Sequence, residues 1–285
     1  MDNNLTTNMT QITKFLRYPG SKRRMLKFLI QHLPQKDTIW GRYIEPFVGS
    51  GAVFFLISPK KAVLSDVNPD LINLFKGIKK YPNEVWSNYC EFGNSKMDYE
   101  VIRRASQLRT IQEKAARVLY LNRTCFKGMW RTNKNGMFNV GYGGQDRRWA
   151  INEQNLLEVS EALKTARIHC VDFEETISNA MSGDFIFVDP PYRPGLKHET
   201  NDHYSGKTFN FEDQQRLSKM LKWATQNKIL WAMTNTSHRD VVKLYSGCYK
   251  LNFPTGTGHL PGLLVKRPGE VLISNYSLKG GRKIS

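Results

Sequence analysis

Short apolar runs alternate with longer amphipathic segments along most of the chain. A short apolar run bounded by polar residues is typical of a buried strand, and apolar positions recurring every three or four residues are typical of a helix. The alternation predicts an α/β fold with a parallel sheet. We expect strands at 43–47, 61–66, 166–171, 184–188 and 229–234, a closing pair at 248–253 and 270–276, and helices at 52–57, 69–79, 99–122, 211–225 and 237–245.

The alternation is interrupted between about residues 80 and 160. The segment 99–122 has helical spacing, and 123–148 is rich in glycine, asparagine, arginine and aromatic residues. Its Asn135-Gly136 pair is typical of a β-hairpin turn. Because the strand and helix rhythm resumes afterwards, we interpret 81–159 as a domain inserted into one formed by 1–80 and 160–285. A polar loop is expected at 194–209.

The charge of the chain is strongly positive, with 42 Lys and Arg against 25 Asp and Glu, a net charge of +17. Such an excess favours a polyanionic partner, because phosphate neutralisation supplies most nonspecific affinity for nucleic acid. The four cysteines are widely separated and indicate neither a metal site nor disulfides. No apolar run reaches the length of a membrane span, and the polar start lacks a signal-peptide core. We therefore expect a cytoplasmic protein.

A glycine turn follows the first predicted strand, in the segment 45–51 (EPFVGSG). Gly49 and Gly51 would let a ligand approach the backbone closely, beside the unpaired N–H groups of a helix start. Asp66 ends the second predicted strand, 17 residues after Gly49, near the position where doubly wound sheets carry an acid that binds ribose hydroxyls. Two alternatives remain open: the turn is only a tight connection, and Asp66 only caps the helix that starts near Pro69.

The most specific motif is Asp189-Pro190-Pro191-Tyr192, at the end of a buried strand and hence at the carboxyl edge of the sheet. Two prolines remove two N–H donors and leave a carboxylate, carbonyls and a ring. Such a pocket suits a planar base with an amino group: Asp189 and the Pro190 carbonyl would accept its hydrogen bonds and Tyr192 would stack on it. A base from a duplex must flip out to enter. The alternative is a rigid turn after a core strand.

These motifs, in this order, resemble the Dam-type DNA adenine-N6 methyltransferases. The resemblance runs from about residue 12 to residue 276 and rests on the segments 15–23 (FLRYPGSKR), 45–51, 65–68 (SDVN), 121–123 (LNR), 138–140 (FNV) and 189–192. It implies a Rossmann-like methyltransferase sheet with helices on both faces and an inserted, mainly helical DNA-recognition domain with a hairpin. It further implies S-adenosyl-L-methionine as the cofactor, and a site-specific enzyme that methylates a flipped-out adenine in double-stranded DNA.

The resemblance also implies roles for individual residues. The catalytic residues would be Asp189, Pro190, Pro191 and Tyr192. The cofactor-binding residues would be Tyr18, Lys22, Glu45, Phe47, Gly49, Gly51, Asp66 and Asp189. Tyr18 and the Gly20-Ser21-Lys22 run stand where the family more often has Trp and Gly-Gly-Lys. From its neighbours alone, Lys22 would instead be one member of a solvated basic run.

DNA contacts are expected from the segment 123–148. The residues are Arg123, Phe126, Lys127, Arg131, Asn133, Asn139, Arg147 and Arg148. Phe126 could wedge into the stack that a flipped base leaves, and arginines can read guanine edges or grip phosphate. Gly144 stands where GATC-methylating enzymes tend to carry an arginine, which leaves the recognition sequence open.

Other functions remain as alternatives. The pocket could take cytosine N4, an RNA base or a protein amide, although Asp rather than Ser or Asn at position 189 favours adenine. A DNA-binding module without catalysis would also account for the positive charge. We expect a monomer, in a bacterial cell or encoded by a phage, without metal and without membrane contact; a companion restriction endonuclease is compatible with this interpretation.

Overall fold

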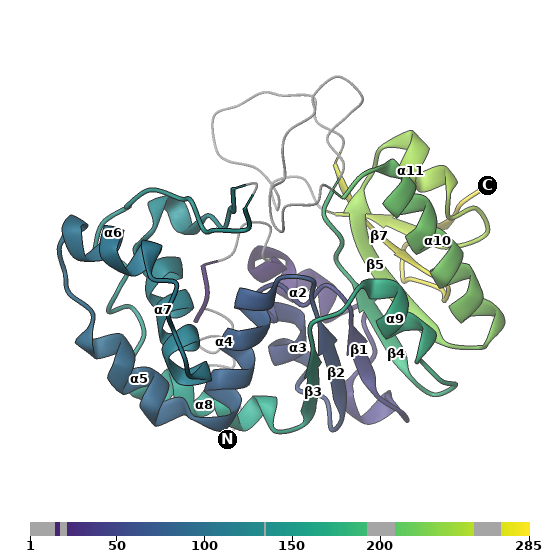
Figure 1. Ribbon diagram of the computed structural model, residues 1–285. Helices are drawn as coiled ribbons and strands as arrows, with labels where there is room; N and C mark the ends of the chain where they lie inside the picture. The colour runs from purple at the N-terminus through teal and green to yellow at the C-terminus, as the bar shows by residue number, and fades with distance from the viewer. Residues whose placement is uncertain (1–14, 18–21, 134, 193–208, 254–268) are drawn as a thin grey trace.

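The computed structural model describes residues 15–17, 22–133, 135–192, 209–253 and 269–285 (Figure 1). Eight strands of these residues form one sheet: β1 Tyr43–Glu45, β2 Ala62–Ser65, β3 Ala166–His169, β4 Phe185–Val188, β5 Leu230–Thr236, β6 Tyr249–Asn252, β7 Glu270–Ser274 and β8 Arg282–Lys283. Their order is β3-β2-β1-β4-β5-β7-β6-β8. The first five are parallel, whereas β7 runs antiparallel between β5 and β6. The predicted α/β parallel sheet is confirmed.

Helices cover both faces of the sheet, because side chains along the central strands alternate between two apolar cores. Ile44, Ile186 and Trp231 face a core completed by α9 (Phe173–Ser178), α10 (Phe211–Gln226) and α11 (Arg239–Lys243). Tyr43 and Phe185 face the opposite core. The elements that contribute to that opposite side are η1 Lys22–Met25, α2 Leu26–Leu29, α3 Ala52–Ile57 and α4 Pro69–Lys80; a short turn, η2, covers Lys36–Thr38.

A group of helices lies between α4 and β3 in the sequence. It consists of α5 Pro82–Glu91, α6 Lys96–Arg104, α7 Ile111–Thr124 and α8 Glu153–Leu163. Figure 1 shows the group beside the β3 edge of the sheet, where α4 packs along α7. The group coincides with the segment that interrupts the strand and helix rhythm of the sequence.

The single helix expected over 99–122 is wrong. Two helices are present, α6 and α7, each with its own capping box at its start. The Thr110 hydroxyl accepts a hydrogen bond from the Glu113 amide, and Glu113 accepts one from the Thr110 amide. These bonds satisfy the first amides of α7 and fix its start, so the helical pattern on either side belongs to separate elements.

The predicted hairpin follows α7, and its first arm contains the short turn η3 (Phe126–Gly128). It is held by two isolated antiparallel bridges, Cys125 with Tyr142 and Thr132 with Phe138. Gly136 has a φ of 74°, as a tight hairpin turn requires. The loop expected at 194–209 lies outside the described residues except for Phe209. No helix in the described part of the chain is long and apolar enough to cross a membrane.

Candidate functional site

Four loops meet at the carboxyl edge of the parallel strands, where the strand order reverses between β1 and β4. In open α/β sheets this reversal creates the crevice in which ligands bind. The glycine turn follows β1, Asp66 follows β2, Asp172 follows β3 and Asp189 follows β4. Buried Glu45, the last residue of β1, lies within electrostatic reach of both Asp66 and Asp189. The sheet therefore brings the sequence-predicted acids to one place.

The glycine turn requires its glycines. Gly49 has a φ of 47° and Gly51 a φ of 67°, both in the left-handed region that side chains disfavour. A Cβ atom on Gly51 would lie 2.9 Å from a ring carbon of Phe55. At these two positions, between β1 and α3, the backbone therefore carries no side chain.

Asp66 links the second strand to the glycine turn. One carboxylate oxygen accepts the Gly49 amide at 3.2 Å, and the other accepts the Asn68 amide at 3.0 Å. Burial raises the pKa of Asp66 to about 6, although these amide donors oppose the increase. The alternative that Asp66 caps the following helix is wrong, because the Asn68 side chain caps α4 through the amides of Asp70 and Leu71.

Glu45 is a buried acid at the end of the central strand, 2% exposed. The Tyr43 hydroxyl donates to its Oε2 at 2.8 Å. Burial raises the pKa of Glu45 well above its ordinary value, and the nearby charges of Asp189 and Asp66 raise it further, against the Tyr43 hydrogen bond. Glu45 therefore retains its proton far more readily than an exposed glutamate does.

Phe47 forms an apolar wall beside the glycine turn. Its ring stacks on Phe173 with 5.3 Å between centroids and meets Phe209 edge-on at 5.7 Å. Phe173 opens α9, the helix that follows β3. The three rings thus join the loop after β1 to the start of α9 and to the segment before α10.

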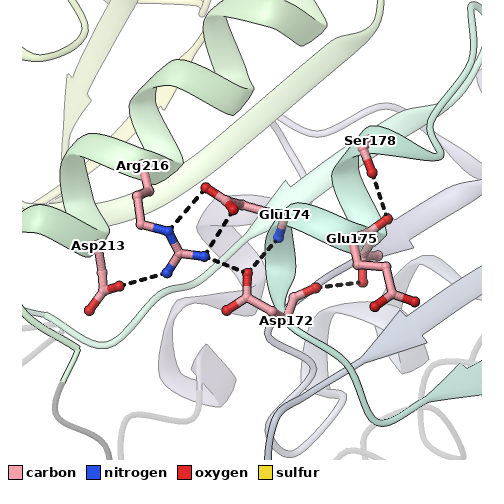
Figure 2. A network of polar contacts seen from close by, with 7 residues as sticks. Asp172, Glu174, Glu175, Ser178, Asp213 and Arg216 are labelled. Carbon is pink, nitrogen blue, oxygen red and sulfur yellow. Dashed lines mark hydrogen bonds and ion pairs between the residues drawn. The ribbon is translucent and has the colours of Figure 1, made fainter.

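Figure 2 shows what holds the start of α9 in place. The Arg216 guanidinium of α10 contacts Asp172 at 2.9 Å, Glu174 at 3.0 Å and Asp213 at 2.8 Å. It also lies over the Phe173 ring, 4.8 Å from the centroid. One side chain thus fastens the first turn of α10 to the loop that leaves β3.

Asp189 is held by two side chains from distant parts of the sequence. Lys22 Nζ lies 2.8 Å from Oδ1, and the Thr234 hydroxyl donates to the same oxygen at 2.6 Å. Both contacts fall on the same oxygen, Oδ1, and together they fix the orientation of the carboxylate.

Lys22 is buried. The alternative that it is one member of a solvated basic run is therefore wrong. It is 5% exposed, and its Nζ lies 4.6 Å from the centroid of the Tyr192 ring. Burial lowers the pKa of Lys22, but attraction to Asp189, with smaller contributions from Tyr192 and Glu270, outweighs it and leaves the pKa above its usual range. Lys22 therefore stays a cation between the carboxylate and the ring.

Several residues expected to bind DNA lie on the surface. Phe126, 47% exposed, projects from the start of the hairpin segment beside Lys127. Arg131 and Arg147 are exposed, and Arg131 donates to the Asn139 side chain at 2.9 Å. Asn133 is also exposed, but its side-chain oxygen accepts two amides of the hairpin turn.

Two of the expected DNA contacts need correction. Arg148 is fully buried and donates to the carbonyls of Tyr89, Phe92 and Gly93 and to the Asn94 side chain. Arg123 is 3% exposed and donates to the Arg147 carbonyl. Both guanidinium groups bind backbone inside the helical group, where no duplex can reach them.

The sequence interpretation missed Thr234 and Arg216. A polar residue near the end of β5 was a usable signal for Thr234, because β5 pairs with β4 and Met233 lies opposite Val188. The position of Tyr18, an expected cofactor contact, lies outside the described residues. In the described part of the chain, no group of acidic, histidine or cysteine side chains could hold a metal ion.

The chain matches a protein-family model described as D12 class N6 adenine-specific DNA methyltransferase over residues 18–255. It is 30% identical to the Type II methyltransferase M1.LlaDCHI of Lactococcus lactis subsp. cremoris, over 96% of this chain and 99% of that protein. It is 30% identical to the Type II methyltransferase M.MjaIII of Methanocaldococcus jannaschii (83% and 89%) and 31% identical to the DNA adenine methylase of Vibrio cholerae (82% and 84%). A solved structure complexed with SAH overlaps 94% of this chain and 56% of its own at a TM-score of 0.40 and 9% identity, a likeness too distant to support an argument.

Proposed function

The chain belongs to the D12 class of N6 adenine-specific DNA methyltransferases, and on this premise we propose that Asp189 and the Pro190 carbonyl receive the amino group of the target adenine. The enzyme transfers a methyl group to adenine N6 in DNA, and its family implies S-adenosylmethionine as the methyl donor. The observation that carries the proposal is the orientation of Asp189 by Lys22 and Thr234 through a single oxygen.

The chemistry needs a more nucleophilic amine. The lone pair of an adenine amino group is delocalised into the ring, and acceptors for both N–H bonds localise it on nitrogen. Asp189 Oδ2 would accept one and the Pro190 carbonyl the other, while Tyr192 stacks on the flipped-out base. The nitrogen would then take the methyl group from the sulfonium, the carbon–sulfur electron pair would stay on sulfur, and Asp189 would accept the proton that the amino group loses and pass it to water.

The residues on the β1, β2 and β3 side fit the cofactor. S-adenosylmethionine, when bound, supplies an electrophilic methyl group on a positively charged sulfur. Asp66 would accept the ribose hydroxyls, and the bare backbone of Gly49 and Gly51 would allow the close approach. Phe47 would form an apolar wall beside the ligand. Glu45 and Lys22 would define the floor between Asp66 and Asp189, and Tyr18 stays an expected contact.

We further propose that the segment 81–159 is the target-recognition domain. The support is its exposed set of one aromatic and several basic or amide side chains, namely Phe126, Lys127, Arg131, Asn133 and Arg147, with half-buried Asn139 bonded to Arg131. Phe126 would fill the gap left by the flipped base. We infer a monomer that methylates duplex DNA in the bacterial cytoplasm, because a single asymmetric transfer needs one site and the substrate is found there.

The test is methyl transfer from labelled S-adenosylmethionine to duplex DNA by the Asp189→Asn and Asp189→Ala variants. We expect turnover to fall by about 100-fold or more, the order lost when one positioned transition-state contact is removed, while DNA binding is retained. Asp146→Asn, an exposed acid of the inserted segment, is the control. Mass analysis of the nucleosides should find N6-methyladenine. Full turnover by Asp189→Ala, or methylation of cytosine, would contradict the proposal.

A further inference from the structure

A buried amide side chain holds the loop that carries the catalytic motif. Gln214, in the first turn of α10, is fully buried, and its Nε2 donates to the Pro191 carbonyl at 3.3 Å. Its Oε1 accepts from Nδ2 of Asn235 at 3.1 Å, and Asn235 is fully buried as well. A chain of hydrogen bonds therefore runs from β5 through α10 to the loop after β4.

A backbone amide fixes which side-chain atoms donate and which accept in this series of hydrogen bonds. The Thr236 amide can only donate, and it donates to Asn235 Oδ1 at 2.8 Å. The Asn235 amide group is thereby oriented, so that its nitrogen faces Gln214. Gln214 must then present its own nitrogen to Pro191. The orientation of both amides follows from one backbone N–H group, without the usual ambiguity between oxygen and nitrogen.

The loop depends on such outside donors, because Pro190 and Pro191 have no N–H groups with which to hold it. Gln214 occupies the Pro191 carbonyl, and Thr234 occupies Asp189 Oδ1. Thr234 and Asn235 are consecutive on β5, so their side chains project to opposite faces of the sheet. The end of one strand thus helps to hold Asp189 and Pro191, on either side of Pro190, whose carbonyl is the acceptor that the proposed function assigns to the target amine.

The backbone of Gln214 is itself anchored. Asn210 and Asp213 form a capping box at the start of α10. Two residues further along, Arg216 fastens the helix to Asp172 and Glu174 at the start of α9 (Figure 2). The donor to Pro191 is therefore presented from a turn that cannot easily shift.

We propose that Gln214, oriented by Asn235, is a positioning residue that selects the Pro190 carbonyl over the Pro191 carbonyl as the acceptor for the target amine. It acts through the loop and touches no substrate. The inference rests on the proposed function of Asp189 and Pro190. In this proposal, side chains of α10 and β5 hold the loop that carries the catalytic motif in its active geometry.

The Gln214→Glu variant tests this with a pH profile. A protonated carboxyl group can still donate to the Pro191 carbonyl, whereas a carboxylate can only repel it. We expect near-normal kcat at low pH and a fall as the pH rises through the pKa of the new carboxyl group, while the wild-type profile lacks this step. Gln214→Met, which keeps the volume without the hydrogen bonds, should lose about 10- to 100-fold in kcat at every pH, on the scale of a small misplacement of a reacting group.

The matched controls are Gln215→Glu and Gln215→Met, at the exposed neighbouring position of the same helix; both should behave as wild type. KM for S-adenosylmethionine should change little in the Gln214 variants. Their melting temperature should fall, because buried groups lose a hydrogen-bond partner, so kcat is compared at a temperature where every variant is fully folded. Asn235→Asp gives an independent test, because a carboxylate there cannot donate to Gln214 and would turn its amide round. It should lower kcat with Gln214 intact.

Asp189→Asn is assayed in parallel to separate the two proposals. If it loses turnover but the Gln214 and Asn235 variants keep the wild-type kcat and pH profile, the positioning role is overturned and the proposed function stands. If Asp189→Asn keeps full turnover, the proposed function fails first. A fall in kcat that follows a fall in melting temperature, with no recovery of Gln214→Glu at low pH, also overturns the positioning role.

Discussion

At the scale of single residues, opposing influences set the chemistry of the site. Asp66 accepts two backbone amides, which favour its charged form, yet its burial prevails and brings its pKa to about 6. Lys22 shows the reverse balance, since Asp189 keeps it charged despite its burial. We therefore expect substitutions around these two groups to change their protonation, and with it cofactor binding and turnover.

Asp66 gives a pH-dependent prediction. Because its pKa in the free protein is about 6, it is an ionised and strong acceptor above that pH and a protonated, weak one below it. We expect the association constant for S-adenosylmethionine to be constant at high pH and to fall up to about tenfold per pH unit below 6. Calorimetric titration between pH 5 and 8 measures it. Asp66→Asn should bind weakly with no such step, and a flat wild-type profile would refute the assignment.

The site residues whose position could be predicted from the sequence are those that directly follow a predicted strand. Asp66 and Asp189 follow apolar runs, so their place at the sheet edge followed from the pattern. Lys22 and Thr234 could not be predicted in this way, because each meets Asp189 only through folding of distant segments. From neighbours alone, Lys22 is indistinguishable from a solvated lysine.

At the scale of elements, the helical group between α4 and β3 is built around a buried cation. Arg148 crosses to α5 and binds three carbonyls, and it is enclosed by the rings of Tyr89, Tyr120 and Trp149. Arg147, the preceding residue, is exposed. Two adjacent arginines therefore serve different ends, one for stability and one for the proposed DNA surface.

This difference predicts opposite outcomes for the two arginines. Arg148→Met should lower the free energy of unfolding by at least about 3 kcal/mol, because several buried carbonyls lose their donor. Arg147→Gln should leave stability unchanged and weaken duplex DNA binding. Urea unfolding and fluorescence anisotropy with labelled DNA measure the two quantities. The assignment would be wrong if Arg148→Met were as stable as wild type and bound DNA less tightly.

Element boundaries show what a periodic pattern can and cannot predict. The helix at 52–57 was predicted to the residue, and the seven expected strands to within one or two residues at each end, whereas the two-residue strand β8 was not expected. The break between α6 and α7 was missed because apolar spacing continues across it, although Thr110 and Glu113 carry the capping-box spacing that ends one element and starts another. Arg148 was misassigned because a buried arginine has no sequence signature.

At the scale of the whole molecule, the net charge of +17 predicts how DNA binding responds to salt. Each phosphate neutralised contributes about −0.9 to the slope of log K against log salt concentration, so six to ten contacts would cost about 10³- to 10⁵-fold between 50 and 200 mM salt. Anisotropy titrations should find a slope of this order for duplex DNA and a far shallower one for S-adenosylmethionine. A DNA slope near zero would contradict a phosphate-dominated interface.

The sequence predicted that the strands form a parallel sheet, but it did not predict the order of the strands in that sheet. Alternating strands and helices indicate a parallel sheet, and the return of the rhythm after residue 160 indicates an insertion. The placement of β7 between β5 and β6 depends on contacts between segments far apart, which no local pattern contains. The same limit applies to the pairing of β1 with β4, where Tyr43 lies opposite Phe185.

That pairing joins parts of the chain made at very different times. Asp66 lies before the helical group and Asp189 after it, so a nascent chain still being synthesised at α7 contains the first acid and lacks the second. A polypeptide cut in the connection 105–110 would likewise yield two inert fragments, each with half of the crevice. If two such fragments reassociated, the restored enzyme would methylate nearby DNA, and that methylation could be detected. The connection 105–110 is therefore a suitable place to split the enzyme for a proximity sensor.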